Sequence, residues 1–240
     1  MSILICGVAG IGRSLARRLH ARGVPLHLLA RGAAKLQALS AELGGAPFTV
    51  ADASSDSFEG AVRDAAAASP LRGLVYAIGS IPLKPLKGTS AADFLSAFTV
   101  NALGAALALK AAAPALAAGA QPGSAVFFST VACAQGFPNH AAISMAKGAV
   151  EALTRSAAAE LAPRVRVNCI APSLTDTPLA ARMLSSDAMR KALGEAHPIP
   201  RVGQSDDVAA LAELLLEPTS FINGQVLAVD GGRSTLRPKN

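Results

Sequence analysis

The feature that most constrains the fold is a short apolar run that passes directly into a glycine turn and then into a helix-like segment. Residues 3–6 are apolar, and Gly7, Gly10 and Gly12 follow within the next six positions. Glycine lets the backbone turn sharply and approach a ligand closely, and the first turn of a helix offers unpaired N–H groups to an anion. Apolar residues at 11, 15 and 19 are typical of one face of a helix. These residues predict a strand, a turn and a helix with an anion site between them.

The next apolar run, residues 25–30, ends at a basic residue rather than an acidic one. In a dinucleotide-binding unit, an acidic side chain about twenty positions after the glycines holds the ribose 2′-hydroxyl of NAD. This chain has Ala30 at that point and Arg31 next to it. A guanidinium can bind a 2′-phosphate through two hydrogen bonds, whereas an acid would repel it. The pattern therefore favours NADP(H) over NAD(H). The alternative is that Arg31 is an ordinary solvated arginine at a strand end.

Short apolar runs alternate with alanine-rich, helix-like stretches along the chain, which is typical of a parallel sheet with helices on both faces. We expect residues 1–240 to form one Rossmann-type, doubly wound α/β domain with about seven strands. The proline-rich stretch 173–200, with a helical piece near 187–193, is expected to form a substrate loop or lid, and 233–240 a loosely held basic tail. The predicted strands are residues 3–6, 25–30, 47–50, 74–78, 125–129, 164–170 and 225–229.

Composition excludes several classes of protein. Hydrophobic residues make up 51% of the chain and charged residues 16%, so it is neither a disordered protein nor a coiled coil. No apolar run is expected to span a bilayer, and the N-terminus lacks the pattern of a signal peptide, so we expect a soluble cytoplasmic protein without a membrane partner. Cys6, Cys133 and Cys169 have no metal-ligand spacing and predict reduced thiols rather than a metal site.

The net charge of +6 raises the question of a nucleic-acid partner. Four arginines, at positions 13, 17, 18 and 22, share the first predicted helix. The chain has no Trp, a single Tyr and no motif of a nucleic-acid reader. We therefore expect a solvated basic surface and no nucleic acid, with a mild preference for phosphorylated cofactors or thioester carriers.

Several segments, in order, resemble the short-chain dehydrogenase/reductase family over nearly the whole chain. The glycine turn is similar to the family's TGxxxGIG motif but is one residue shorter and has Cys6 in place of the threonine. Residues 166–173 resemble RVNxIxPG with Ser173 in place of the glycine, and residues 221–232 resemble ITGQxLxVDGG. The resemblance implies NADP(H) as cofactor and a homo-oligomer, a dimer or tetramer, built on the helices at 102–118 and 145–161. It implies cofactor contacts at Gly7, Gly10, Ile11, Gly12, Arg31, Asp52, Ala77, Gly79, Lys147 and Thr177.

The catalytic segment departs from the family pattern. The resemblance implies that Lys147 binds the nicotinamide ribose, that Asn101 serves as a structural and proton-relay residue, and that Thr130 replaces the serine that polarises a carbonyl. A threonine hydroxyl donates the same hydrogen bond. The family has a tyrosine four residues before the lysine, and this chain has Ile143 there. An isoleucine cannot pass a proton, so the usual donor is missing.

Residues 138–147 resemble the PNYxxMxxxK motif of enoyl-thioester reductases, and 74–79 resemble their VHSIG. His140 then takes the place of the tyrosine. Seven positions along a helix return to within about 20° of the same side, so His140 and Lys147 can face one cleft if a helix begins near His140. Beside an ammonium group a neutral imidazole is favoured, and it is expected to donate a hydrogen bond. For His140 the alternative is a helix cap or a partly buried histidine, and for Lys147 it is a pair with Glu151 on the helix face. Tyr76 is expected to pack against the cofactor crevice, with proton donation by its hydroxyl as the alternative.

Two functions of different classes follow. The first is an NADP(H)-dependent oxidoreductase that reduces a carbonyl or an activated double bond of a small molecule, with His140 or a water near Asn101 as the proton source. The second is a non-catalytic NADP(H)-binding sensor or partner-binding protein. It is favoured by the missing tyrosine, because the loss of a positioned proton donor costs about 10²–10⁴ in rate. A purely structural or nucleic-acid module is disfavoured.

Overall fold

In the computed structural model, which describes residues 1–237, seven parallel strands form one sheet in the order β3-β2-β1-β4-β5-β6-β9. The strand order changes direction between β1 and β4, as the doubly wound α/β fold requires. All seven predicted strands are present. Their bounds are β1 (Ser2–Cys6), β2 (Leu26–Ala30), β3 (Phe48–Val50), β4 (Leu71–Tyr76), β5 (Gly123–Phe128), β6 (Val165–Pro172) and β9 (Val226–Val229).

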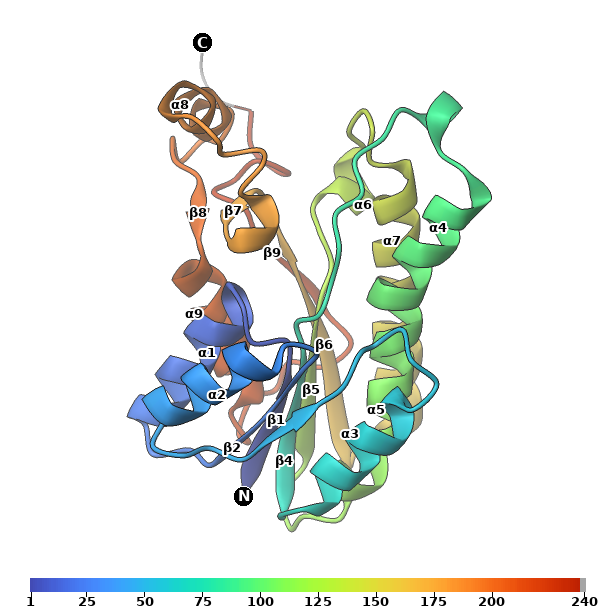
Figure 1. The fold of residues 1–240 in the computed structure, drawn as a ribbon, viewed down its shortest axis with the longest axis vertical. Coiled ribbons are helices and arrows are strands. Elements are labelled where there is room, and N and C mark those ends of the chain that lie inside the picture. Colours follow the sequence, from blue (N-terminus) through green and yellow to red (C-terminus); the bar gives the residue numbers. More distant parts are fainter. Residues whose placement is uncertain (238–240) are drawn as a thin grey trace.

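Helices cover both faces of the sheet (Figure 1). One face carries α1 (Ile11–Ala21), α2 (Ala33–Glu42) and α9 (Ser205–Leu216), and the other carries α3 (Phe58–Ala67), α5 (Gly104–Ala117) and α7 (Ala141–Leu161). The core is split accordingly, because side chains alternate along each strand. In β1, Leu4 and Cys6 pack on the α3–α5 side, whereas Ile3 and Ile5 pack on the α1–α9 side.

The end of β4 differs from the predicted strand 74–78. β4 begins earlier, at Leu71, and stops at Tyr76, which is the partner of Cys6 in β1. Because β1 turns away at Gly7, the next residues of β4 lose their strand partner and form a loop. That loop lies at the carboxyl ends of the strands, beside the point where the strand order changes. In open α/β sheets, ligands bind in this crevice.

The stretch 173–200 is more structured than a plain loop. It contains β7 (Thr175–Asp176), a 3₁₀ turn (Pro178–Ala180) and α8 (Asp187–Glu195), which confirms the predicted helical piece. β7 pairs with the two-residue strand β8 (Gly203–Gln204). In Figure 1 these elements stand together above the carboxyl ends of the strands. Of the tail predicted at 233–240, residues 238–240 lie outside the described part of the chain.

One helical run corrects the expectation that no apolar segment is long enough to cross a membrane. α4 (Ala91–Phe98), a π-helical segment (Thr99–Leu103) and α5 are continuous from Ala91 to Ala117, and this run passes the test of length and composition. In the fold, however, α5 packs on α3 and β4, and α4 packs on α7. The run is therefore packed against the protein on one side, with 39% of its most apolar stretch buried.

A short helix, α6 (Ala132–Gln135), packs against α7.

Candidate functional site

The turn between β1 and α1 brings backbone segments closer together than side chains allow. Gly7 has a φ of 102° and Gly10 a φ of 48°, values that L residues rarely adopt. A Cβ on Gly12 would lie 1.9 Å from the carbonyl oxygen of Gly7, and one on Gly7 would lie 2.7 Å from the carbonyl carbon of Ala77. α1 begins directly after the turn, at Ile11, with no side-chain cap. The turn therefore has the close backbone approach and uncapped helix start that suit a phosphate.

Arg31 and Asp52 lie just beyond the carboxyl ends of the neighbouring strands β2 and β3. The pKa of Asp52 is lowered mainly by hydrogen bonds from the hydroxyl and backbone N–H of Ser54, at 2.7 and 2.9 Å, and the charge of Arg31 adds to this effect. Arg31 is exposed. Within residues 1–237 it forms no ion pair. Its guanidinium is therefore available to an anionic ligand.

Three of the predicted site residues converge just beyond β4. A Cβ on Gly79 would lie 2.9 Å from Oδ1 of Asn101 and 3.6 Å from Nζ of Lys147. Asn101 is fully buried; its amide donates to the Ser80 hydroxyl at 3.0 Å, and its oxygen accepts from the Ser80 N–H at 3.2 Å. Asn101 lies in the π-helical segment, a distortion that often occurs at functional sites. A glycine at 79 thus lets the backbone approach the Asn101 amide and the Lys147 ammonium more closely than a side chain would permit.

Lys147 is buried beside the sheet, with 9% of the residue exposed. Its Nζ donates to the carbonyl oxygen of Phe128, at the end of β5, over 2.8 Å. Burial lowers the pKa of Lys147 to about 8. The alternative pairing with Glu151 is not observed, because the Glu151 carboxylate accepts from the Ser129 hydroxyl at 2.6 Å instead. Lys147 therefore carries a proton that titrates near neutral pH, in a region of low dielectric.

Thr130 lies two residues beyond β5. Its Oγ1 accepts from the backbone N–H of Ala132 at 3.2 Å, and this contact leaves the hydroxyl proton for another acceptor. Nearby, Cys133 is half-buried and lies 3.4 Å from the Ser129 hydroxyl. Burial raises the pKa of Cys133, so the group is a neutral thiol at physiological pH. Of these two groups, Thr130 is the one suited to orient a ligand oxygen.

His140 immediately precedes α7, where the spacing to Lys147 predicts that the helix begins. Its Nδ1 lies 2.7 Å from the carbonyl oxygen of Pro138. A carbonyl can only accept, so Nδ1 carries a proton and Nε2 of a neutral ring carries none. The prediction of a neutral donor is therefore wrong for Nε2, which can donate only from the imidazolium. His140 also packs against Phe137, and no contact within residues 1–237 joins it to Lys147.

Tyr76 is not at the crevice, contrary to the prediction. Its hydroxyl donates to the carbonyl oxygen of Val100 at 2.6 Å, and its ring stands edge-on to Phe58 beneath α3 and α5. Burial raises the pKa of Tyr76 well above its ordinary value. Position 143 carries no polar group either, since Ile143 is 3% exposed and packed into the protein. No phenol is therefore placed to donate a proton here.

Thr177 reaches back across the crevice to the glycine turn. A Cβ on Gly10 would lie 2.8 Å from the methyl carbon of Thr177 and 3.7 Å from Cδ of Pro178. The family resemblance assigns Thr177 to the nicotinamide end of the cofactor and the glycine turn to its pyrophosphate. The structure thus places Thr177 in contact with that turn, at Gly10. Gly10 permits this contact because it has no side chain.

The basic first helix is neutralised by ion pairs. The four arginines at 13, 17, 18 and 22, on α1 and directly after it, each contact a carboxylate on α2, on α9 or at Glu217, so the expected solvated basic surface is instead lined with ion pairs between α1, α2 and α9. The pairs are Arg13–Glu42, Arg17–Glu42, Arg18–Asp206, Arg18–Glu213, Arg22–Glu213 and Arg22–Glu217.

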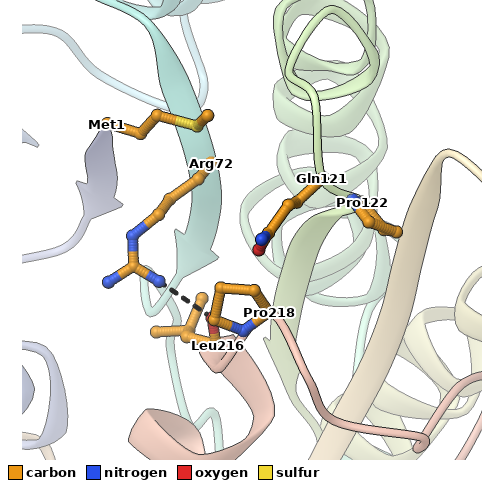
Figure 2. A pocket seen from close by; sticks show the side chains of 6 residues that line it. All are labelled: Met1, Arg72, Gln121, Pro122, Leu216 and Pro218. Atoms are coloured by element: carbon orange, nitrogen blue, oxygen red, sulfur yellow. Dashed lines mark hydrogen bonds between the residues drawn. The ribbon is translucent and has the colours of Figure 1, made fainter.

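A pocket of about 300 Å³ lies at the opposite end of the sheet, where the strands begin. Figure 2 shows Arg72 reaching from β4 to the carbonyl oxygen of Leu216, a hydrogen bond of 3.1 Å. None of the predicted site residues lines it. Its lining is Met1, Arg72, Gln121, Pro122, Leu216 and Pro218.

Sequence reasoning missed several polar groups that hold the site. Ser80 fixes the Asn101 side chain, and its place directly after Gly79 at a strand end is a signal that could have identified it. Ser129 and Glu151 are 22 positions apart and carry no such signal. Within the described part of the chain no cluster of three or more His, Cys, Asp or Glu side chains could hold a metal ion.

Known proteins are similar to this chain over nearly its whole length. A family model described as Enoyl-(Acyl carrier protein) reductase matches residues 7–234. A tropinone reductase homologue from Arabidopsis thaliana is 31% identical over 244 residues, which cover 98% of this chain and 76% of the relative. A short-chain type dehydrogenase/reductase from Mycobacterium ulcerans is 30% identical, with a TM-score of 0.89 over 99% of this chain and 90% of that one. A structure of ElxO with NADP bound is 25% identical, with a TM-score of 0.88 over 98% and 99%.

Proposed function

This chain belongs to the short-chain dehydrogenase/reductase family, and we propose that it is an NADP(H)-dependent oxidoreductase that reduces a carbonyl or an activated double bond of a small molecule. The observation that carries the proposal is the convergence of Gly79, Asn101 and Lys147 beside the glycine turn. It brings a fixed amide and a buried ammonium together at the point where α/β sheets bind ligands.

The residues present fit a phosphorylated dinucleotide. The glycine turn and the uncapped start of α1 would hold the pyrophosphate, Asp52 the adenine end, and Lys147 the nicotinamide ribose. Exposed Arg31, without an ion pair in residues 1–237, would bind the 2′-phosphate. ElxO, a structural neighbour, has NADP bound, which supports this choice of cofactor. When bound, the reduced nicotinamide supplies a hydride.

The chain's own residues would orient the substrate and supply the proton. The Thr130 hydroxyl donates to the substrate oxygen and so orients it for reduction. Lys147, held by the Phe128 carbonyl, places a positive charge where negative charge develops on that oxygen. The proton comes from His140 or from a water near Asn101. If it comes from Nε2 of His140, the ring must be protonated, because the Pro138 carbonyl already takes the Nδ1 proton.

A second candidate is a non-catalytic NADP(H)-binding protein that acts as a sensor or binds a partner. Two observations favour it. Ile143 is packed into the protein, with 3% exposed, at the position where the family has its tyrosine. The hydroxyl of Tyr76 donates to the Val100 carbonyl oxygen and is not free for a substrate. Hydride transfer without a strong proton donor is slow.

The proposal includes a cytoplasmic homo-oligomer, a dimer or tetramer. Its support is a set of exposed apolar side chains on the mutually packed helices α4 and α7 and the π-helical segment between α4 and α5. A second copy of the same helices would cover them. The side chains are Leu95, Phe98, Leu103 and Met145.

Titration with NADPH and NADH tests the cofactor assignment, and NADPH consumption with ketones, quinones and enoyl thioesters tests the reaction. We expect NADPH to bind more tightly, and Arg31→Asp to weaken NADPH binding by about 10- to 100-fold with little effect on NADH. Arg63→Asp, which changes an exposed arginine on α3, is the control. Equal affinity for the two cofactors, or an unchanged preference in Arg31→Asp, contradicts the assignment. Binding without turnover of any substrate favours the second candidate.

A further inference from the structure

A buried histidine outside the proposed reaction centre is fully engaged by hydrogen bonds. His197 is 4% exposed, and its Nδ1 lies 2.9 Å from the carbonyl oxygen of Leu193 and 3.3 Å from that of Gly194. Its Nε2 lies 2.8 Å from Oγ of Ser173. Carbonyl oxygens only accept, so the proton of the neutral ring is on Nδ1, and Nε2 accepts from the Ser173 hydroxyl. In the neutral ring, the carbonyl contacts of Nδ1 thus set the tautomer and with it the direction of the bond from Ser173.

The pair joins the two ends of the segment above the crevice. Ser173 is the first residue after β6, and His197 follows α8. Ser173 is also anchored to the sheet, because its N–H donates to the carbonyl oxygen of Val229 at 3.1 Å. A Cβ on Gly231 would lie 3.6 Å from Cβ of His197, so the histidine packs against the turn after β9. The contact therefore closes the base of residues 174–196 onto the sheet.

A serine next to a histidine also occurs in nucleophilic catalysis, but this pair lacks what that chemistry needs. The third group is a main-chain carbonyl rather than a carboxylate. With His197 4% exposed, water cannot reach the ring to release an acyl group. The geometry points to a role in positioning.

From Ser173, alternate residues connect to the glycine turn. The Thr175 hydroxyl donates to the carbonyl oxygen of Ser173 at 2.9 Å, and the Thr177 hydroxyl lies 3.4 Å from the carbonyl oxygen of Thr175. The Thr177 side chain then packs against Gly10. The backbone from Ser173 to Thr177 is thus held by side chains on every second residue, with His197 at one end and the glycine turn at the other.

We infer that Ser173 and His197 are positioning residues that set the path of residues 173–177 and hold Thr177, the residue that would contact the nicotinamide end of the dinucleotide, against the glycine turn. The identity of that ligand rests on the proposed function. The positioning itself is a property of the chain. The family resemblance places a glycine at position 173, so this hydroxyl is a feature of the present sequence.

Hydrogen exchange on the nucleotide-free protein tests the positioning directly. Ser173→Ala removes the hydroxyl, and loss of one hydrogen bond is expected to speed exchange of the amides at 175–184 by about fivefold. Ser173→Thr keeps a hydroxyl and is expected to restore slow exchange. Ser40→Ala, which removes a hydroxyl that donates to the Ala46 carbonyl on the α2 side, is the matched control and leaves these amides unchanged. Unchanged exchange in Ser173→Ala overturns the inference, whether or not the protein binds a nucleotide.

Nucleotide binding then tests the assignment to the nicotinamide end. Ser173→Ala is expected to weaken NADPH about fivefold while leaving 2′-phospho-ADP-ribose, which lacks the nicotinamide, within about twofold of the parent. Ser173→Thr should rescue NADPH affinity. Equal weakening of both ligands, or of neither, overturns this assignment. A parent protein that binds neither ligand contradicts the proposed function instead, and the exchange measurement still decides the positioning.

Discussion

The two ends of the proposed crevice are built by different means. At the end near α1 the backbone defines the site, since a Cβ on Gly12 would lie only 1.9 Å from the Gly7 carbonyl oxygen. At the end near α7 side chains define it, since Asn101 and Lys147 lie directly beside Gly79. The backbone end resembles the family's glycine turn with one residue fewer, whereas at the side-chain end Ile143 stands where the resemblance implies a tyrosine.

The difference shows why binding and chemistry can separate in one fold. A site made of backbone N–H groups depends on a few glycines, and other side chains can change around it. A proton donor depends on a single side chain, so one substitution removes it and leaves the fold intact. Substitutions at the two ends should therefore have different effects, on stability at the backbone end and on activity at the side-chain end.

The largest effect is expected at the backbone end. Gly12→Ala places a methyl group against a fixed carbonyl oxygen, so it should lower the free energy of unfolding by more than about 4 kcal/mol or prevent folding. Thermal and denaturant unfolding of the ligand-free protein would measure it. Gly148→Ala in α7, where nothing lies within 4 Å of the new methyl group, is the control and should stabilise by about 0.5–1 kcal/mol. Similar stability of the two variants would mean that the turn relaxes easily.

The next effect concerns the missing proton donor. Ile143→Tyr puts a phenol four residues before Lys147 on the same helix, and we expect NADPH-dependent ketone reduction to rise by about 100-fold or more. Ile143→Phe introduces the same ring without the hydroxyl and separates proton donation from repacking of this buried position. If the two variants have equal activity, the defect at the side-chain end is not the absent phenol.

The smallest effect comes from the buried ammonium. With the pKa of Lys147 at about 8 in the folded protein and near 10.5 ordinarily, the unfolded chain binds more protons between these values. The contribution of Lys147 to stability should therefore become more favourable with pH across this window, by at most about 1.4 kcal/mol per pH unit. The buried thiols of Cys6 and Cys169, whose pKa values are raised, act in the opposite direction in both proteins, so denaturant unfolding at several pH values would show the Lys147 contribution as a stability of the parent that rises relative to that of Lys147→Met. Lys191→Met, at an exposed lysine, should behave like the parent. Parallel curves for parent and Lys147→Met would mean that the ammonium is solvated.

The sequence was sufficient to predict the seven-stranded sheet and the glycine turn, because hydrophobic runs and glycine spacing are local signals. β7 and β8 were missed, since strands of two residues have no periodicity. The end of β4 was misplaced because it depends on where its partner β1 turns away. The bounds of a strand cannot be predicted from its own residues where a partner strand distant in the sequence sets them.

The candidate site shows this limit most clearly in its polar partners. Helical spacing suggested a pair between Lys147 and Glu151, but the Phe128 carbonyl at the end of β5 binds Lys147, and Ser129, the next residue, binds Glu151. The proton position on His140 depends on one carbonyl oxygen, that of Pro138. The partner of Ser173 is 24 positions away. The residue types could be predicted from the sequence, but their hydrogen bonds could not.

The ion pairs between α1 and α9 have a consequence for synthesis. Arg18 and Arg22 find their partners 188 to 195 positions later in the chain. A ribosome releases the N-terminal region first, so α1 leaves the exit tunnel long before α9 exists. Until then its arginines have no counter-charge from α9 and its apolar face lacks that neighbour. The part of the crevice that is translated first is therefore among the last to be completed.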